Sequence, residues 1–244
     1  MLTVYIGFDT REPIAYDVAK YSILKHASGP VNIHPLKLAE LNEQRLITRE
    51  LVRQDGKFFD VISQAPASTE FAISRFLSVL LQRSGWAIFM DCDMVFTDDI
   101  YDIFKELDPK YAIQCVQHNH VPKETVKMDD QPQTVYNRKN WSSFFAINAD
   151  HPANRRLTFD MINSLPGRDL HAFCWLKDEE IGALTPGWNW LVNVQEKPAQ
   201  LHNAHLTLGG PWFPNWTPQP HDDLWLKYHD WMLAEQQTPS RKQA

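Results

Sequence analysis

The sequence lacks the features that mark several classes of protein. It has only three cysteines, at positions 92, 115 and 174, and because they form no CxxC pair, neither a disulfide framework nor a zinc knuckle is predicted. No apolar run approaches the roughly 20 residues of a membrane span. The first residues include no basic stretch, so no signal peptide is predicted. We therefore expect a cytoplasmic protein without a membrane span.

A surplus of positive charge is also missing. The 244 residues include 30 Asp and Glu against 24 Lys and Arg, which gives a formal net charge of −6. A general nucleic-acid binder shows a basic stripe, so no nucleic-acid partner is expected. The length and the hydrophobic content of 43% suit one large α/β domain. With no repeat and no linker, we predict a single domain over residues 1–236 and a disordered polar tail over 237–244.

Apolar patterns and turn residues predict strands that alternate with helices. The predicted strands are 2–8, about 33–36, 86–90, 111–116 and 143–148, and the predicted helices begin at Pro13 and cover about 69–82, 154–163 and 222–235. Residues 86–90 are apolar throughout, as in a strand that is covered on both faces of a parallel sheet. The polar segment 118–140 is predicted to be a long loop or a hairpin. This order predicts an α/β fold with a mixed, mainly parallel sheet flanked by helices.

The strongest local signal is a pair of acids directly after the strand 86–90. Asp91 and Asp93 leave the sheet together, at the edge where open α/β sheets bind ligands. Carboxylate ligands at this spacing suit magnesium or manganese, which can also bridge a diphosphate. An Asp-x-Asp alone is common in turns and helix caps, but two unpaired carboxylates beside apolar flanks would be strongly unfavourable. The sequence therefore predicts a metal site here.

A second cluster lies near the end of the chain, in the motif His-x-x-x-Gly-Gly-Pro-Trp. His205 can supply a third metal ligand, and Gly209 and Gly210 would let backbone N–H groups approach phosphate oxygens. The alternative is a structural histidine that precedes a tight turn.

These two motifs together resemble the retaining glycosyltransferases of family eight, the group of glycogenin and the bacterial lipopolysaccharide galactosyltransferases. The resemblance extends from Val4 to Trp212. It implies a single GT-A-type domain and a metal-dependent hexosyltransferase. The reaction implied is transfer from a nucleotide-diphosphate sugar, UDP-linked and with retention, to a glycan, glycolipid or other hydroxyl acceptor, as in bacterial polysaccharide biosynthesis.

The resemblance also implies roles for individual residues. Asp91, Asp93 and His205 would bind manganese or magnesium. The nucleotide-sugar donor would be contacted by residues from four parts of the chain: Phe8, Asp9, Thr10 and Arg11; Arg75; Ser142 and Ser143; and Gly209 and Gly210. The family carries a lysine where this chain has Gly210, and backbone amides, Arg11 or Lys177 are the candidates to replace it.

An acidic run, Asp178–Glu180, occupies the place where the family faces its donor sugar. Asp178 or Glu179 would stabilise the positive charge that develops on the sugar. The alternative is a solvated first turn of a helix, where the helix dipole favours acids.

Other interpretations fit parts of the sequence. A sugar nucleotidyltransferase would need a Gly-rich basic loop after the first strand, which Gly7 and Arg11 alone do not supply. A carbohydrate-binding or scaffold protein fits the aromatic content of 12% but does not explain the acidic pair. His118-Asn119-His120 is a weak metal motif, and Asp129-Asp130 is predicted to lie in a loop.

The last predicted helix carries aromatic residues on one side but no cationic face. Packing on the domain is therefore expected rather than contact with a membrane surface, although peripheral contact is left open. The oligomeric state is not indicated.

Overall fold

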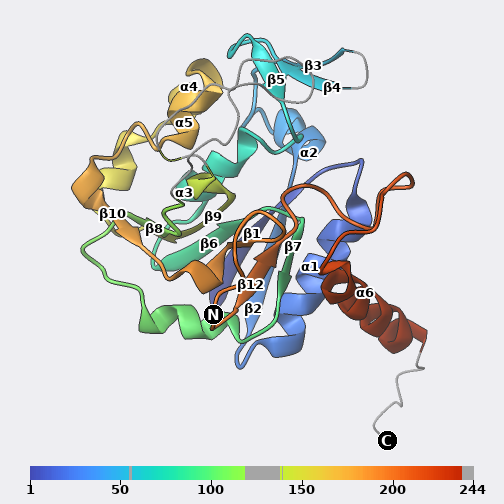
Figure 1. The fold of residues 1–244 in the computed structure, drawn as a ribbon. Helices are drawn as coiled ribbons and strands as arrows, with labels where there is room; N and C mark the ends of the chain where they lie inside the picture. The colour runs from blue at the N-terminus through green and yellow to red at the C-terminus, as the bar shows by residue number, and fades with distance from the viewer. Residues whose placement is uncertain (55–56, 119–137, 139, 238–244) are drawn as a thin grey trace, which may run out of the picture.

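The centre of the molecule is a six-stranded sheet with the strand order β10-β8-β9-β6-β1-β2 (Figure 1). This computed structural model describes residues 1–54, 57–118, 138 and 140–237. The strands of the large sheet are β1 (Leu2–Phe8), β2 (Val31–Lys37), β6 (Trp86–Met90), β8 (Ile113–Cys115), β9 (Phe144–Asn148) and β10 (Ile181–Ala183). β1 is parallel to β2 and β6, β10 is parallel to β8, and β9 runs antiparallel to both of its neighbours. The predicted mixed, mainly parallel sheet is confirmed.

Helices flank this sheet. The α-helices are α1 (Pro13–His26), α2 (Leu38–Glu43), α3 (Leu77–Leu81), α4 (Phe159–Ser164), α5 (Gly167–His171) and α6 (Asp222–Gln237). The 3₁₀ helices are η1 (Ser74–Phe76), η2 (Ile100–Lys105), η3 (Trp141–Ser143), η4 (Pro152–Arg156), η5 (Asp178–Glu180) and η6 (Pro186–Trp188). None of the described helices is both long enough and apolar enough to cross a membrane.

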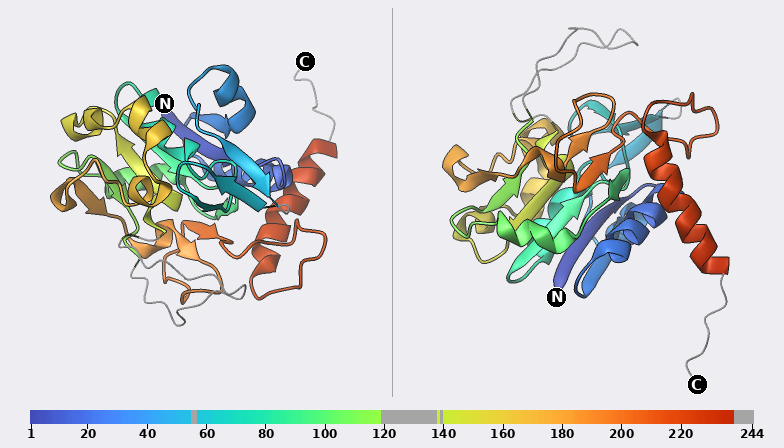
Figure 2. Two further views of the ribbon diagram at one scale, coloured as in Figure 1. Left: turned by 90° about the horizontal axis from the view of Figure 1, so that it is seen from above. Right: turned by 60° about the horizontal axis from the view of Figure 1, so that its bottom comes forward.

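The last helix packs on the domain, as expected. α6 lies beside α1 in both views of Figure 2, and its Trp225, Tyr228 and Met232 are buried. Tyr228 Oη lies 2.7 Å from Nε2 of His26 at the end of α1. α6 continues to Gln237, which was assigned to the tail, and the other tail residues lie outside the described part of the chain. The predicted domain boundary stays a prediction.

The strand β6 is the apolar centre of the sheet. Its residues 87–90 are at most 1% exposed, because strands lie on both sides of β6 and side chains cover both of its faces. Phe89 stacks on Phe145 of β9 at a ring distance of 5.2 Å. The reading of residues 86–90 as a fully covered strand is therefore correct, and the end of this strand is held rigidly.

Two small sheets were not predicted. One is antiparallel and consists of β3 (Leu51–Gln54), β4 (Lys57–Asp60) and β5 (Ala65–Ala67); the other has the order β11-β12-β7 and consists of β7 (Met94–Phe96), β11 (Trp190–Leu191) and β12 (Asn203–His205). β7 begins directly after the acidic pair. The second small sheet therefore joins this pair to the end of the chain.

The predicted helix over 69–82 is wrong in its first half, where turns precede η1 and α3. The backbone N–H of Glu70 donates to Oδ2 of Asp9 (3.2 Å), and the Glu70 carboxylate accepts from the hydroxyl of Thr10 (2.6 Å). These contacts with the loop after β1 hold the segment in turns. Likewise, the predicted helix 154–163 is divided into η4 and α4. In the predicted loop 118–140, residues 119–137 and 139 lie outside the described residues.

Candidate metal centre and donor site

The turn between β6 and β7 carries the two acids, and strand pairing brings the histidine to them. β7 pairs with β12 so that Met94 lies opposite His205. His205 Nε2 consequently lies 3.3 Å from Oδ1 of Asp93. One ligand atom from each of Asp91, Asp93 and His205 lies within 4.8 Å of the other two. The structure thus brings together the three residues predicted to bind metal.

The chemistry of this triad fits a divalent cation. Oδ1 of Asp91 and Oδ1 of Asp93 are buried. Among the described residues neither accepts a hydrogen bond of good geometry, although Oδ1 of Asp91 lies 2.8 Å from Nη1 of Arg75 and Oδ1 of Asp93 lies 3.3 Å from Nε2 of His205. A buried carboxylate oxygen without a hydrogen bond is unfavourable, and a cation would satisfy both oxygens at once. Two carboxylates and one imidazole suit manganese or magnesium. The residues present therefore fit the expected metal.

A second layer of contacts orients the histidine. His205 Nδ1 lies 3.0 Å from Oδ1 of Asn189, and Nδ2 of Asn189 donates to Oγ of Ser143 (2.9 Å). Since the amide oxygen can only accept, the proton belongs on Nδ1, which leaves the lone pair of Nε2 for a metal. The sequence analysis missed Asn189. Its only signal was a polar residue between Trp188 and Trp190.

Arg75 and the serine pair, which were predicted to contact the donor, lie beside the triad. Nη1 of Arg75 lies 2.8 Å from Oδ1 of Asp91 and donates to the carbonyl of Ser142 (2.8 Å). The backbone N–H of Asp91 donates to the carbonyl of Ser143 (2.9 Å). Ser142 Oγ lies 2.6 Å from Nδ1 of His171. η3 and η1 therefore hold the acidic turn from both sides.

The pKa values within the triad are coupled. Burial raises the pKa of Asp91 to about 7; Arg75 opposes this shift, and the neighbouring Asp93 adds to it by less than Arg75 offsets. Burial acts in the same direction on Asp93, but His205 lowers the pKa of this acid overall. Burial opposes the charged form of His205, yet Asp93 raises its pKa. A cation among these groups would replace the protons that they otherwise share.

The loop after β1 is fixed by its own ion pair. Asp9 is fully buried, and its Oδ1 accepts from the backbone N–H and from Nε of Arg11, both at 2.9 Å. The Arg11 guanidinium also lies over the ring of Phe58 at 4.7 Å. Phe8 is partly buried and Thr10 is exposed. Arg11 is therefore already engaged, which weakens it as a substitute for the family's phosphate-binding lysine.

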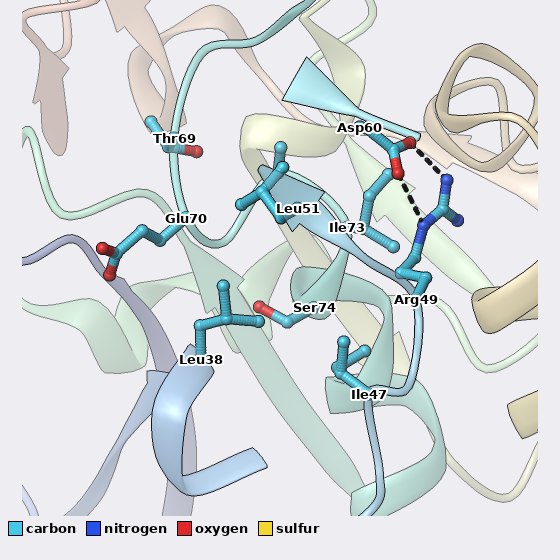
Figure 3. A pocket seen from close by; sticks show the side chains of 10 residues that line it. Leu38, Ile47, Arg49, Leu51, Asp60, Thr69, Glu70, Ile73 and Ser74 are labelled. Carbon is cyan, nitrogen blue, oxygen red and sulfur yellow. Dashed lines mark hydrogen bonds and ion pairs between the residues drawn. The ribbon is translucent and has the colours of Figure 1, made fainter. Parts of the chain in front are cut away.

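A small pocket lies next to this loop (Figure 3). Its wall is mostly apolar, but the polar residues Thr69, Glu70 and Ser74 also line it. The Arg49–Asp60 ion pair lies on the side opposite Glu70. Thr69 Oγ1 and Ser74 Oγ are buried without a hydrogen bond to the described residues. Glu70 therefore lines the pocket and also bonds to the β1 loop. Another lining residue, Ser74, directly precedes Arg75 in the sequence.

The two late glycines have different environments. Gly209 has a φ of +100°, which favours glycine, and its N–H already donates to the carbonyl of Leu206 (2.8 Å). A Cβ atom at Gly210 would lie 2.1 Å from the ring of Trp212. A lysine at position 210 would therefore require Trp212 to move.

A further carboxylate, which the sequence analysis did not single out, lies next to the acidic turn. Glu12 is only 7% exposed, and its Oε2 accepts from Nε1 of Trp212 (2.9 Å). The Sγ of Cys92, between the two acidic ligands, lies 3.7 Å from Oε1 of Glu12. Burial, Asp93 and Asp9 raise the pKa of Glu12 to about 7.

The acidic run lies apart from this network. Its 3₁₀ helix η5 leads into β10 at the edge of the large sheet, and the side chains of Asp178 and Glu179 are 91% and 73% exposed. Asp178 forms an ion pair with Arg138, and Lys177 is mostly exposed beside Glu179. Among the described residues, no hydrogen bond or ion pair joins this run to the metal triad. Its catalytic role stays a prediction.

One member of the weak His-x-His motif is close to the site. His118 is 7% exposed, its Nδ1 lies 3.1 Å from Nε2 of Gln195, and burial together with His205 lowers its pKa to about 4. It is not part of the triad. Asn119, His120 and the pair Asp129-Asp130 lie outside the described residues.

Comparison with known proteins adds a relative and a fold. No protein-family model matches the chain. The chain is 43% identical over 229 residues to protein CDI of Arabidopsis thaliana, an alignment that covers 91% of this chain and 84% of that protein. The chain belongs to the family of protein CDI. The name of that family states no activity, so the site itself has to suggest one.

Solved structures with the same fold as this CDI-family chain are glycosyltransferases. The glycosyltransferase GlyE of Streptococcus pneumoniae TIGR4 matches with a TM-score of 0.57 and 13% identity, over 96% of this chain and 62% of GlyE. An active-site mutant of LgtC matches with 0.59 and 12% (93% and 95%), and mouse xyloside xylosyltransferase 1 with 0.51 and 13% (90% and 99%). At such low identity the likeness shows the fold, which is of the GT-A type. The CDI-family chain spans less than two thirds of GlyE.

Proposed function

We propose that the chain transfers a sugar from a nucleoside-diphosphate sugar to a hydroxyl acceptor, with manganese or magnesium held by Asp91, Asp93 and His205. The observation that carries this proposal is the triad at the end of β6, with two buried carboxylate oxygens that accept no well-aligned hydrogen bond from the described part of the chain. In an open α/β sheet this edge is where ligands bind. The GT-A-type fold supports the same assignment.

The bound cation would supply positive charge to the diphosphate as it leaves. The chain's own residues prepare the site for that step. Asn189 holds His205 in the tautomer that binds metal, and Arg75 keeps Asp91 in place. In this proposal the guanidinium of Arg75, which lies beside the triad, would also contact the sugar of the donor, as the family resemblance implies.

The other donor contacts in this proposal surround the triad. The loop Phe8, Asp9, Thr10 and Arg11 would hold the nucleoside, Ser142 and Ser143 would line the sugar pocket, and the backbone at Gly209 and Gly210 would face the diphosphate. Within this loop Asp9 accepts hydrogen bonds from the backbone and the side chain of Arg11, which fixes its position. Preorganised donors of this kind stabilise developing charge without reorganisation during the reaction.

The finer assignments of the proposal rest on resemblance. They are a UDP-linked donor, manganese as the metal, retention at the anomeric carbon, and Asp178 or Glu179 as the acid that faces the sugar. A glycan or glycolipid acceptor and a cytoplasmic location belong to the same set. A role in bacterial polysaccharide biosynthesis also stays a prediction, and protein CDI comes from a plant.

Thermal-shift and hydrolysis assays test the proposal directly. A nucleotide sugar at 100 times its dissociation constant stabilises the folded state by about 2.7 kcal/mol, so a screen with manganese identifies the donor. We expect stabilisation and slow donor hydrolysis that both require the metal. The matched control is Asp93→Asn. Stabilisation that is equal with and without metal, or the absence of any responding nucleotide sugar, would contradict the proposal.

A further inference from the structure

Glu12 directly precedes the first helix, but its side chain does not cap that helix. α1 begins at Pro13, so Glu12 occupies the N-cap position, where shorter side chains such as Asp, Asn, Ser and Thr usually accept a hydrogen bond from the first turn. The Glu12 side chain makes no such bond. It is buried and turned toward the late segment of the chain.

The carboxylate instead joins two segments that are distant in sequence. Oε2 accepts from the indole N–H of Trp212 (2.9 Å), and Oε1 lies 3.7 Å from Sγ of Cys92, inside the Asp91–Asp93 turn. Glu12 therefore contacts both the turn that carries the metal ligands and the segment 206–216, which we call the late loop.

Trp212 connects Glu12 to the backbone of the late loop, because its ring lies against Gly210. Its ring covers Gly210 so closely that a Cβ atom there would be 2.1 Å away, and it packs against Trp225 of α6 at a ring distance of 5.2 Å. A largely enclosed indole N–H needs a hydrogen-bond acceptor, and Glu12 supplies it. The position of the Glu12 carboxylate thus determines where Trp212 and the Gly210 backbone lie.

We propose that Glu12 is a positioning residue that, through Trp212, holds the late loop beside the metal turn and so sets the affinity for the diphosphate half of the donor. This inference rests on the proposed function. In the resembled family a lysine side chain at this place contacts a phosphate of the donor. Here Trp212 occupies the space that a side chain at position 210 would need, so the Glu12–Trp212 hydrogen bond would position the loop backbone for that contact instead. The cation and the loop backbone then contact the diphosphate together.

Hydrogen exchange tests the positioning without any ligand. In metal-free protein, Glu12→Ala and Trp212→Phe should each raise amide exchange in residues 206–216 by about tenfold, because both remove the same hydrogen bond. Glu12→Gln keeps an acceptor oxygen and should exchange within about threefold of the wild type. Exchange that is unchanged in Glu12→Ala, or equally fast in Glu12→Gln, would overturn the positioning role.

Calorimetry of UDP binding in saturating manganese tests the consequence. Glu12→Ala and Trp212→Phe should each weaken UDP binding about tenfold, a size typical of residues that orient ligand groups, and the double variant should be no weaker than either single one. Manganese binding alone should change by less than about threefold. Additive losses, or a loss confined to manganese binding, would refute the inference.

The two tests separate the inference from the proposed function. If the wild type binds neither UDP nor another nucleoside diphosphate while exchange rises in Glu12→Ala, the proposed function fails and the inference loses its binding half. If Glu12→Ala binds UDP as well as the wild type does, the inference fails and the proposed function stands.

Discussion

The Arg49–Asp60 pair and the Arg75–Asp91 pair differ in how completely their charges are satisfied. Arg49 donates to both carboxylate oxygens of Asp60 and to the carbonyls of Ile162 and Leu165, while Asp60 also accepts from Ser63. The side chains of this pair are 2% and 4% exposed. It ties the small β3-β4-β5 sheet to the segment around α4.

The pair of Arg75 with Asp91 is left incomplete. Oδ1 of Asp91 is 2.8 Å from the guanidinium but accepts no hydrogen bond from the described residues, and Asp93 lies next to it. Burying a charge is unfavourable unless its remaining lone pairs are satisfied. The Arg49–Asp60 pair, whose carboxylate is fully hydrogen-bonded, is explained by its structural role alone. The Arg75–Asp91 pair, whose carboxylate is not, can still bind a metal cation. This contrast distinguishes the functional pair from the structural one.

The largest effect is expected where the metal is removed altogether. Asp93→Ala should lower sugar transfer by about a thousandfold or more, because the cation supplies several kcal/mol of charge stabilisation. The metal-free variant should keep its fold, since Asn189 still holds His205. Activity assays and metal-free melting curves check both expectations. Asp102→Ala, which breaks an exposed ion pair with Lys105, is the control and should retain activity.

Replacing the arginine of each Arg–Asp pair with an uncharged residue compares the two pairs directly. Arg49→Met and Arg75→Met should each destabilise the metal-free protein by about 3 to 5 kcal/mol, since each leaves a buried carboxylate without its partner. Manganese should restore much of the stability of Arg75→Met but none of that of Arg49→Met. Urea unfolding with and without manganese measures this. Equal responses of the two variants to manganese would remove the distinction between the pairs.

Asp178 and Glu179 extend the comparison to exposed carboxylates, whose charges are solvated by water. Asp178→Asn and Glu179→Gln remove charge and keep shape. At least one should lower kcat about a hundredfold, the size typical of losing one electrostatic stabiliser, with little change in nucleoside-diphosphate affinity. Steady-state kinetics and calorimetry check this. Near-normal kcat in both variants would leave the run as a solvated helix start, in keeping with its exposure.

The orientation of His205 is expected to have a smaller effect than the loss of a ligand. Asn189→Ala removes the acceptor on Nδ1, so the ring can change its tautomer and rotate. Manganese affinity should fall by about 10- to 100-fold, as for other groups that orient a ligand. Titration with manganese measures the loss. Asn193→Ala, on the exposed side of the next turn, is the control, and an equal loss there would contradict the orienting role.

The sequence predicts the parts of this site that depend on local patterns. The covered strand 86–90 and the Asp91–Asp93 pair follow from adjacent residues, since apolar continuity and a polar exit are visible within ten positions. The motif around His205 was found through its resemblance to a family. These predictions place the triad at one edge of the sheet, where the structure has it.

The parts that depend on distant contacts could not be predicted. β11 and β12 contain two and three residues, which is too short for any periodicity to show. Glu12 and Asn189 gain their roles from partners about 200 and 16 residues away, so their types alone carry no signal. The helix predicted from residue 69 fails for the same reason, because Glu70 bonds to the β1 loop instead.

His171 lies near Arg49 and Arg75, and its titration is expected to have the smallest of these effects, a change in how stability depends on pH. Burial, with the charges of Arg75 and Arg49, lowers the pKa of His171 to about 3. The unfolded chain, with a histidine pKa near 6.5, therefore binds one more proton between these values, so stability should fall as the pH drops through this window. One such group contributes about 1.4 kcal/mol per pH unit. His171→Gln should consequently lose less stability than the wild type between pH 6 and pH 4, as measured by urea unfolding without metal. Parallel curves for the two proteins would show that His171 is protonated in the folded state, and the two arginines would then have no combined effect on it.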